Sequence, residues 1–164
     1  MHKLVWITGL QGAGKSTIAR EVFSRASAVH TNTLLLDGDD IRAVFGNDLG
    51  YNVEDRKENA WRVARLCKYL YEQKMNVICA TVSLYREIHE FIYSNFTAPL
   101  VVYIDVPRNE LERRNQKKLY TERKELPGID QYYDIPEHAD FVMRIVNTGG
   151  IHDAAKKIII RIGL

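Results

Sequence analysis

The sequence predicts an α/β fold, a three-layer sandwich in which a five-stranded parallel sheet lies between two layers of helices. Two observations predict it. Short apolar runs alternate with longer amphipathic stretches along the 164-residue chain, and the apolar runs lack strict apolar/polar alternation. Strands of that kind are typical of parallel sheets that are buried on both faces. Right-handed crossovers then place ligands beyond the carboxyl ends of the strands.

Five apolar runs predict the strands, and the amphipathic stretches between them predict the helices. The strands are expected over 4–8, 33–36, 76–80, 100–104 and 141–146, and the helices over 15–28, 54–73, 85–96, 109–114 and 151–162. The clearest helix is 54–73, where Ala60, Val63 and Cys67 lie three and four residues apart on one face. Cys67 and Cys79, the two cysteines, both fall on apolar positions. We expect two buried thiols without a disulfide or a metal.

Size and charge restrict the function. The length suits one domain over 1–164, and a net charge of +2 gives no argument for a nucleic-acid partner. No apolar run is long enough to span a membrane, and the run at 4–7 is too short for a signal peptide, so we expect a cytoplasmic protein. The polar segment 115–139 is predicted to be a lid. Its basic residues suit phosphate contact in an active site better than RNA binding.

A phosphate-binding loop is the firmest motif. Gly9–Ser16 matches G-x-x-x-x-G-K-[ST], with a predicted strand before it and a predicted helix after it. Such a loop wraps backbone N–H groups around a triphosphate, its lysine reaches the β- and γ-phosphates, and its serine hydroxyl binds Mg²⁺. The chain has no N-K-x-D tetrapeptide for guanine, and its length suits a small kinase. The expected ATP-binding residues here are Gly9, Gly12, Ala13, Gly14, Lys15, Ser16 and Thr17.

A second motif, Asp37-Gly38-Asp39-Asp40-Ile41-Arg42, follows the second predicted strand. The carboxylates of Asp37 and Asp39 would serve Mg²⁺ and accept a proton from an attacking hydroxyl, and either is a candidate base. Arg42 lies one helical turn beyond Asp39 and suits an anionic acceptor. The structural alternative is an acidic helix start, with Asp39 or Asp40 as its N-cap.

A third group consists of Tyr51, Arg56 and Asn59. Arg56 and Asn59 are three residues apart near the start of the long predicted helix, on one face of it. Tyr51, just before that helix, offers a ring on which a base can stack. Taken alone, the group is more typical of a solvated helix start.

These motifs together resemble the adenylylsulfate (APS) kinase family of P-loop kinases. The similarity includes 7–19, 36–42, 48–51, 55–59, 82–86, 104–107, 117–120 and 128–130, in order and over nearly the whole chain. It implies transfer of the γ-phosphate of MgATP to the ribose 3′-hydroxyl of a small nucleotide acceptor. The implied catalytic residues are Lys15, Asp37, Asp39 and Lys117, and the implied metal ligands are Ser16 and Asp37.

The resemblance also implies the substrate contacts. Asp39, Arg42, Tyr51, Arg56, Asn59, Val82, Ser83, Lys117 and Leu126 would border the acceptor; Arg114, Thr148 and Gly149 would contact ATP. No membrane or nucleic-acid partner is implied, and a homodimer is compatible with the sequence. Phosphorylation of Ser83 as an intermediate is a less favoured alternative to direct transfer, and a non-catalytic ATP-binding regulator is a rival of another class.

The sequence departs from the family on the acceptor side. Leu126 stands where the family has a phenylalanine that covers the acceptor purine, Gln131-Tyr132 replaces Ser-Pro, and Leu84 replaces a proline. Leucine gives apolar contact without ring stacking. A smaller base would therefore suit the pocket, as in the cytidine diphosphoramidate kinase branch, although Arg42, Arg56, Asn59 and Lys117, which match the family's pattern, slightly favour APS.

Overall fold

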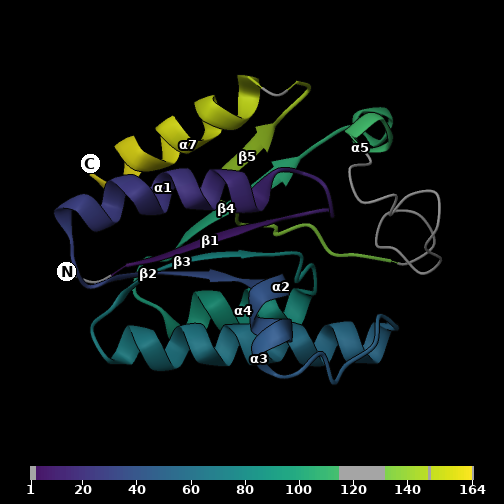
Figure 1. Ribbon diagram of the computed structural model, residues 1–164, viewed down its shortest axis with the longest axis horizontal. Helices are drawn as coiled ribbons and strands as arrows, with labels where there is room; N and C mark the ends of the chain where they lie inside the picture. The colour runs from purple at the N-terminus through teal and green to yellow at the C-terminus, as the bar shows by residue number, and fades with distance from the viewer. Residues whose placement is uncertain (1–2, 115–131, 148, 164) are drawn as a thin grey trace.

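The computed structural model describes residues 3–114, 132–147 and 149–163. A five-stranded sheet lies at its centre with helices on both faces, so the predicted α/β sandwich is confirmed (Figure 1). All strand pairs are parallel. The strands are β1 (Leu4–Gly9), β2 (Thr33–Asp37), β3 (Asn76–Thr81), β4 (Leu100–Asp105) and β5 (Phe141–Arg144), in the order β2-β3-β1-β4-β5.

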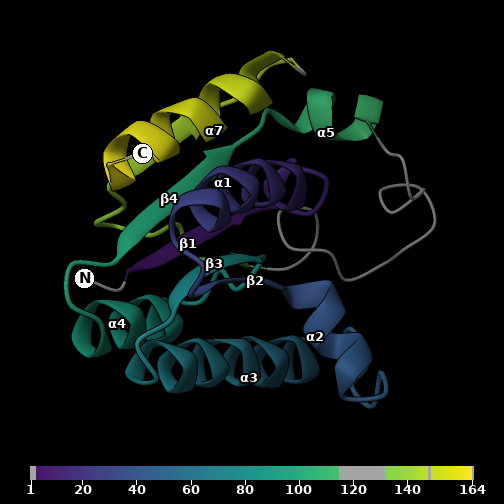
Figure 2. The same ribbon diagram turned by 60° about the vertical axis from the view of Figure 1, so that its left-hand side comes forward.

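Four longer helices form the outer layers. α1 (Lys15–Val29) and α7 (Gly149–Ile162) cover one face of the sheet, and α3 (Val53–Glu72) and α4 (Arg86–Asn95) cover the other (Figures 1 and 2). Two short helices, α2 (Gly38–Val44) and α5 (Arg108–Arg114), follow β2 and β4 at the carboxyl end of the sheet. None of the described helices is both long and apolar enough to cross a membrane.

Alternate residues of β1 enter two separate cores. Val5 and Ile7 pack on the α1/α7 side, whereas Leu4 and Trp6 pack on the α3/α4 side. Burial of both faces explains why the strand sequences showed no polar alternation. Cys67 and Cys79 are fully buried free thiols on the α3/α4 side, as predicted, and burial raises the pKa of the Cys79 thiol.

Helix α2 corrects one prediction. As the structural alternative to a role in catalysis, we expected an acidic helix start with Asp39 or Asp40 as the N-cap. The N-cap is instead Asp37, whose Oδ1 accepts a hydrogen bond from the Asp39 backbone N–H at 3.0 Å. The helix begins earlier because the backbone turns at once after β2. Gly38 permits this turn, since a Cβ there would lie 3.0 Å from Thr81 Oγ1. Asp37 is thereby fixed at the sheet edge, and Asp39 lies in the first turn of the helix.

The carboxyl ends of the strands bring distant motifs together. Thr8 pairs with Thr81, and Asp37 pairs with Ala80, so β1, β2 and β3 end side by side. Gly9 has φ +151°, and a Cβ on it would lie 2.6 Å from the carbonyl oxygen of Ile104. The chain leaves β1 here through a conformation and a space that suit glycine alone.

Of the predicted lid, residues 115–131 lie outside the described part of the chain. Residues 132–139 are described and form neither helix nor strand. They lie against residues 84–86, where Asp134 N–H donates to the carbonyl oxygen of Leu84 at 3.0 Å.

Candidate active site

The phosphate-binding loop connects β1 to α1. Gly12 and Gly14 have φ of +79° and +93°, which allows the loop to curl back over the helix start. Gly14 is the N-cap of α1, and the first turn of that helix carries no acidic side chain to compete for an anion. Lys15 is 8% exposed, and its Nζ donates to the carbonyl oxygen of Leu10 at 2.9 Å. Gly12, Gly14 and Lys15 therefore lie together along one wall of a pocket.

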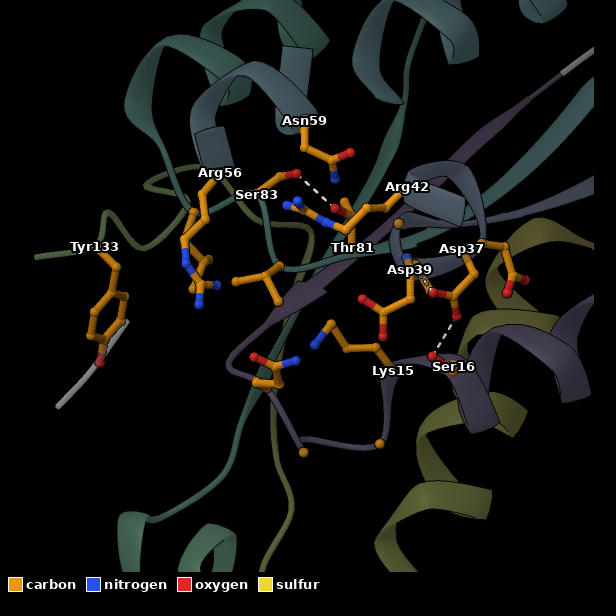
Figure 3. A pocket seen from close by; sticks show the side chains of 18 of the residues that line it. Lys15, Ser16, Asp37, Asp39, Arg42, Arg56, Asn59, Thr81, Ser83 and Tyr133 are labelled. Carbon is orange, nitrogen blue, oxygen red and sulfur yellow. Dashed lines mark hydrogen bonds between the residues drawn. The ribbon is translucent and has the colours of Figure 1, made fainter. Parts of the chain in front are cut away.

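Ser16 and Asp37 form a hydroxyl–carboxylate pair beside the loop. Ser16 Oγ donates to Asp37 Oδ2 at 2.5 Å, while Asp37 Oδ1 caps α2. Figure 3 shows Asp37 and Asp39 on the side of the pocket that faces Lys15 and Ser16. A serine hydroxyl and a carboxylate are the hard oxygen ligands that Mg²⁺ prefers. Both predicted carboxylates thus lie beside the phosphate-binding loop, in the same pocket as Lys15 and Ser16.

Arg42 and Arg56 hold the loop that carries Tyr51. Arg42 is 7% exposed, and its Nη1 donates to the carbonyl oxygens of Leu49 and Gly50 at 2.9 and 2.8 Å. Arg56 Nε donates to the carbonyl oxygen of Tyr51 at 2.6 Å. The guanidinium carbons of Arg42 and Arg56 lie 4.8 and 5.3 Å from the centre of the Tyr51 ring. The two arginines therefore orient the predicted stacking ring.

Asn59 projects from α3 toward the same pocket (Figure 3). It is 8% exposed, and its Oδ1 has no hydrogen-bond partner within the described part of the chain. A buried carbonyl oxygen without a partner costs free energy in the unliganded protein. A donor on a bound ligand would remove that cost.

Ser83 lies deep in the pocket wall. It is 5% exposed, and its Oγ lies 2.7 Å from Thr81 Oγ1. Thr8 Oγ1 donates to the carbonyl oxygen of Val82 at 2.6 Å, which ties this turn to β1. His89 of α4 hydrogen-bonds to the Ser83 backbone, and burial lowers the pKa of its imidazole. The serine hydroxyl thus has a partner inside the protein.

Arg114 lines the pocket from the end of α5. Its Nε donates to Glu110 Oε1 at 2.6 Å, and Arg113 binds the same carboxylate. These two hydrogen bonds lower the pKa of Glu110 to about 2. Arg114 Nη1 and Nη2 are buried and have no hydrogen-bond partner among the described residues. Two guanidinium donors are thereby held at the pocket without a protein acceptor in that part of the chain.

A single cavity of about 550 Å³ collects most of the predicted residues. Lys117, Leu126 and Thr148 lie outside the described residues, and Gly149, exposed at the start of α7, is not among the residues that line the cavity. Gly9 and Ala13 of the loop are buried and do not line the cavity either. The predicted residues that line it are Gly12, Gly14, Lys15, Ser16, Thr17, Asp37, Asp39, Arg42, Tyr51, Arg56, Asn59, Val82, Ser83 and Arg114.

Sequence reasoning missed several lining residues. Gln11 belongs to the phosphate-binding loop and Arg20 to α1, and Tyr85, Tyr132 and Tyr133 also line the cavity. Two adjacent aromatic residues in an otherwise polar segment were a usable signal for Tyr132 and Tyr133. Without the fold, nothing showed that this segment returns to the site.

Known proteins match the chain over most of its length. The family model for adenylylsulphate kinase matches residues 1–144. The cytidine diphosphoramidate kinase of Campylobacter jejuni is 32% identical over 166 residues, which cover 98% of this chain and 96% of that protein. The adenylyl-sulfate kinase of Buchnera aphidicola is 35% identical over 170 residues, which cover 96% and 78%.

A solved structure and a longer relative complete the comparison. The APS kinase CysC of Mycobacterium tuberculosis, in complex with AMPPNP and APS, superposes with a TM-score of 0.86 at 28% identity, covering 99% of this chain and 98% of that one. The bifunctional enzyme CysN/CysC of Xylella fastidiosa is 33% identical over 99% of this chain, which spans 27% of that enzyme's length.

The geometry of the pocket agrees with these matches. A phosphate-binding loop, the carboxylates of Asp37 and Asp39 and the arginines that line the pocket are suited to phosphoryl transfer between nucleotides. The family uses ATP as its phosphate donor, and its members are nucleotide kinases. The chain therefore belongs to the adenylylsulphate kinase family.

Proposed function

We propose that the chain, as a single kinase domain over residues 1–164, transfers the γ-phosphate of MgATP to the ribose 3′-hydroxyl of an APS-like nucleotide. One observation carries this proposal: the phosphate-binding loop and the side chains of Asp39, Arg42, Arg56 and Asn59 line one cavity of about 550 Å³. Direct transfer needs donor and acceptor in one space, because catalysis comes from holding the two in line.

On the donor side, the loop from Gly9 to Thr17 would bind the triphosphate. Lys15 would exchange its hydrogen bond to Leu10 for phosphate oxygens, and Arg114 would place its two available guanidinium donors on the transferred group. Such preorganised donors stabilise the charge of the transition state. Thr148 and Gly149 would lie near the adenine, as the family resemblance implies.

Ser16 and Asp37 would hold Mg²⁺. Their oxygens are already side by side, and the described residues contain no cluster of three or more Asp, Glu, His or Cys that could form a complete protein cage. Mg²⁺ at kinase sites takes one or two protein oxygens together with phosphate oxygens and waters. When bound, the ion would neutralise part of the phosphate charge.

Asp39 is the carboxylate that we assign as the base. Both oxygens of Asp37 are engaged, one by Ser16 and one by the Asp39 backbone N–H. Asp39 lines the cavity two residues beyond the cap, where it would accept the proton of the ribose hydroxyl. Lys117, as the family resemblance implies, would contact the acceptor or the transferred phosphate.

The acceptor itself is APS in our leading proposal, with cytidine diphosphoramidate as the second candidate. The match to a cytidine diphosphoramidate kinase over 96% of that protein favours the second candidate, as does Leu126 in place of a phenylalanine. The retained Arg42, Arg56 and Asn59 favour the first.

An acceptor screen tests the proposal. Purified protein is incubated with MgATP and APS, cytidine diphosphoramidate or plain nucleotides; ADP release is followed and products are identified by mass spectrometry. A 3′-phosphorylated product with one acceptor is the expected result, and Lys15→Ala should abolish it. Tight ATP binding with no acceptor phosphorylated would contradict the proposal and favour an ATP-binding regulator.

A further inference from the structure

The segment 132–139, here called the return segment, is fixed to the start of α4. The backbone N–H of Arg86 donates to Asp134 Oδ2 at 2.9 Å, and Arg86 Nη2 lies 2.8 Å from Glu137 Oε1. The N-cap residue of α4, Tyr85, makes no capping bond with its own side chain, so the carboxylate of Asp134 supplies the cap from 48 residues away. Together with the bond from Asp134 N–H to Leu84, these contacts fix the return segment at the pocket wall.

Tyr133 is held more firmly than its neighbour. It lines the cavity, and its hydroxyl hydrogen-bonds to the hydroxyl of Tyr103, a residue of β4 that is 3% exposed. Tyr132 also lines the cavity, but it is 86% exposed. Between the Tyr103 bond and the anchored Asp134, the Tyr133 ring has little rotational freedom to lose when a ligand binds. Such rigid rings give contact area at low entropic cost.

The position of Tyr133 indicates which part of a ligand it meets. Figure 3 shows its ring well apart from Lys15, Ser16 and Asp37, on the side of the pocket where Arg56 lies. The reacting hydroxyl of an acceptor must lie near Lys15 and Asp39. Its nucleobase, the far end of the molecule, then extends toward the wall that the return segment forms.

We propose that Tyr133 contacts the nucleobase of the acceptor and is a specificity-determining residue for this kinase. The inference rests on the proposed two-substrate function. The flat face of a base packs on an aromatic ring whatever its hydrogen-bonding edge, so the contact favours nucleotides over phosphorylated sugars or sulfate esters that lack a base. Tyr133 supplies an aromatic surface in addition to that of Tyr51.

The test distinguishes the contribution of the Tyr133 ring from that of the hydrogen bond between the Tyr133 and Tyr103 hydroxyls. Tyr133→Phe and Tyr103→Phe each remove the hydroxyl pair and keep the ring in the pocket, whereas Tyr133→Leu removes the ring. Steady-state kinetics are measured with the best acceptor of the wild-type protein and with ATP. Tyr69→Leu, the same chemical change on an exposed side chain of α3 outside the cavity lining, is the matched control. Circular dichroism and thermal melting confirm folding of each variant.

We expect Tyr133→Leu to raise the acceptor KM about tenfold to a hundredfold, the range that loss of one stacked ring produces, with the ATP KM unchanged. Both phenylalanine variants should stay within about threefold of the wild type. An unchanged acceptor KM in a folded Tyr133→Leu protein would overturn the inference. So would an equal loss in all three variants, because that pattern indicates a structural role of the hydroxyl bond.

The two proposals fail in distinguishable ways. Wild-type protein that phosphorylates an acceptor, together with an unaffected Tyr133→Leu variant, overturns the role of Tyr133 alone. Calorimetric titration of the ADP-bound protein with the nucleotides of the screen covers the other case. If none is phosphorylated and none binds, both proposals are wrong. If one binds without turnover, a weaker affinity in Tyr133→Leu than in Tyr133→Phe still supports the base contact.

Discussion

Asp37 combines a structural and a chemical role, and two substitutions separate them. Its Oδ1 caps α2 at 3.0 Å from the Asp39 N–H, and its Oδ2 accepts the hydroxyl of Ser16. Asparagine is about as good an N-cap as aspartate, so Asp37→Asn should change stability by only a few tenths of a kcal/mol. The same substitution removes the negative charge of the side chain that we assign to Mg²⁺ binding.

Asp37→Ala removes both roles. Loss of the cap costs about 0.5–2 kcal/mol, and the Ser16 hydroxyl loses its partner, which adds about 1 kcal/mol. In a domain of this size, about 2 kcal/mol lowers Tm by roughly 4–8 °C. For catalysis, loss of one well-placed electrostatic group reduces kcat about 10²- to 10³-fold, or about 2.7–4 kcal/mol. Both variants should therefore be nearly inactive, and only the alanine variant should be markedly less stable.

Urea unfolding gives the stability of the wild type and both variants. Turnover is measured with MgATP and the acceptor over a range of Mg²⁺ concentrations. An Asp37→Asn protein with wild-type kcat at low Mg²⁺ would refute the metal assignment. An Asp37→Ala protein as stable as the wild type would refute the cap energetics.

Three further predictions test other parts of the site. Gly9→Ala should destabilise the fold by about 1–3 kcal/mol, because the new Cβ meets the Ile104 carbonyl oxygen at 2.6 Å; a wild-type urea midpoint would contradict this. Glu110→Gln should raise the ATP KM severalfold by loosening Arg114. Because the pKa of Glu110 is lowered to about 2, its stabilising effect is present above about pH 4.5 and disappears as pH falls toward 2. The stability difference from wild type in urea unfolding should therefore shrink between pH 6 and pH 2, and a constant difference would contradict the ion-pair account. Ser83→Ala should keep turnover within a few-fold; a phosphoserine in the wild type, detected by mass spectrometry, would contradict direct transfer.

The strongly patterned parts of the fold could be predicted from the sequence. Apolar runs gave five strands, and the stripe through Ala60, Val63 and Cys67 gave the longest helix, within a residue or two of their ends. The strand order could not be predicted, because right-handed crossovers leave open which strand lies in the middle. Helix α2 was expected only as an alternative, since seven residues are too few to show a helical apolar period.

The candidate site likewise contains residues whose contacts could be predicted from the sequence and residues whose contacts could not. The contacts of Lys15 and Ser16 follow from a local motif whose geometry is fixed by neighbouring residues. Arg42 was expected to face the acceptor, and it lines the cavity, but its hydrogen bonds to Leu49 and Gly50 depend on how a loop folds back. Tyr133 depends on a still longer return of the chain, which no local pattern encodes.

The central position of β1 has a consequence for how the two halves of the pocket respond to heat or denaturant. Hydrogen bonds to β3 and β4 flank the strand that leads into the phosphate-binding loop, whereas β2, which leads to Asp37 and Arg42, is an edge strand. Amide hydrogens of β1 should exchange with solvent only through global unfolding, while those of β2 and α2 exchange through smaller openings. Mild denaturant should then weaken the Mg²⁺ and acceptor contacts of Asp37 and Arg42 before the phosphate-binding loop releases the triphosphate, so the enzyme would lose its choice of acceptor while the loop still holds the nucleotide.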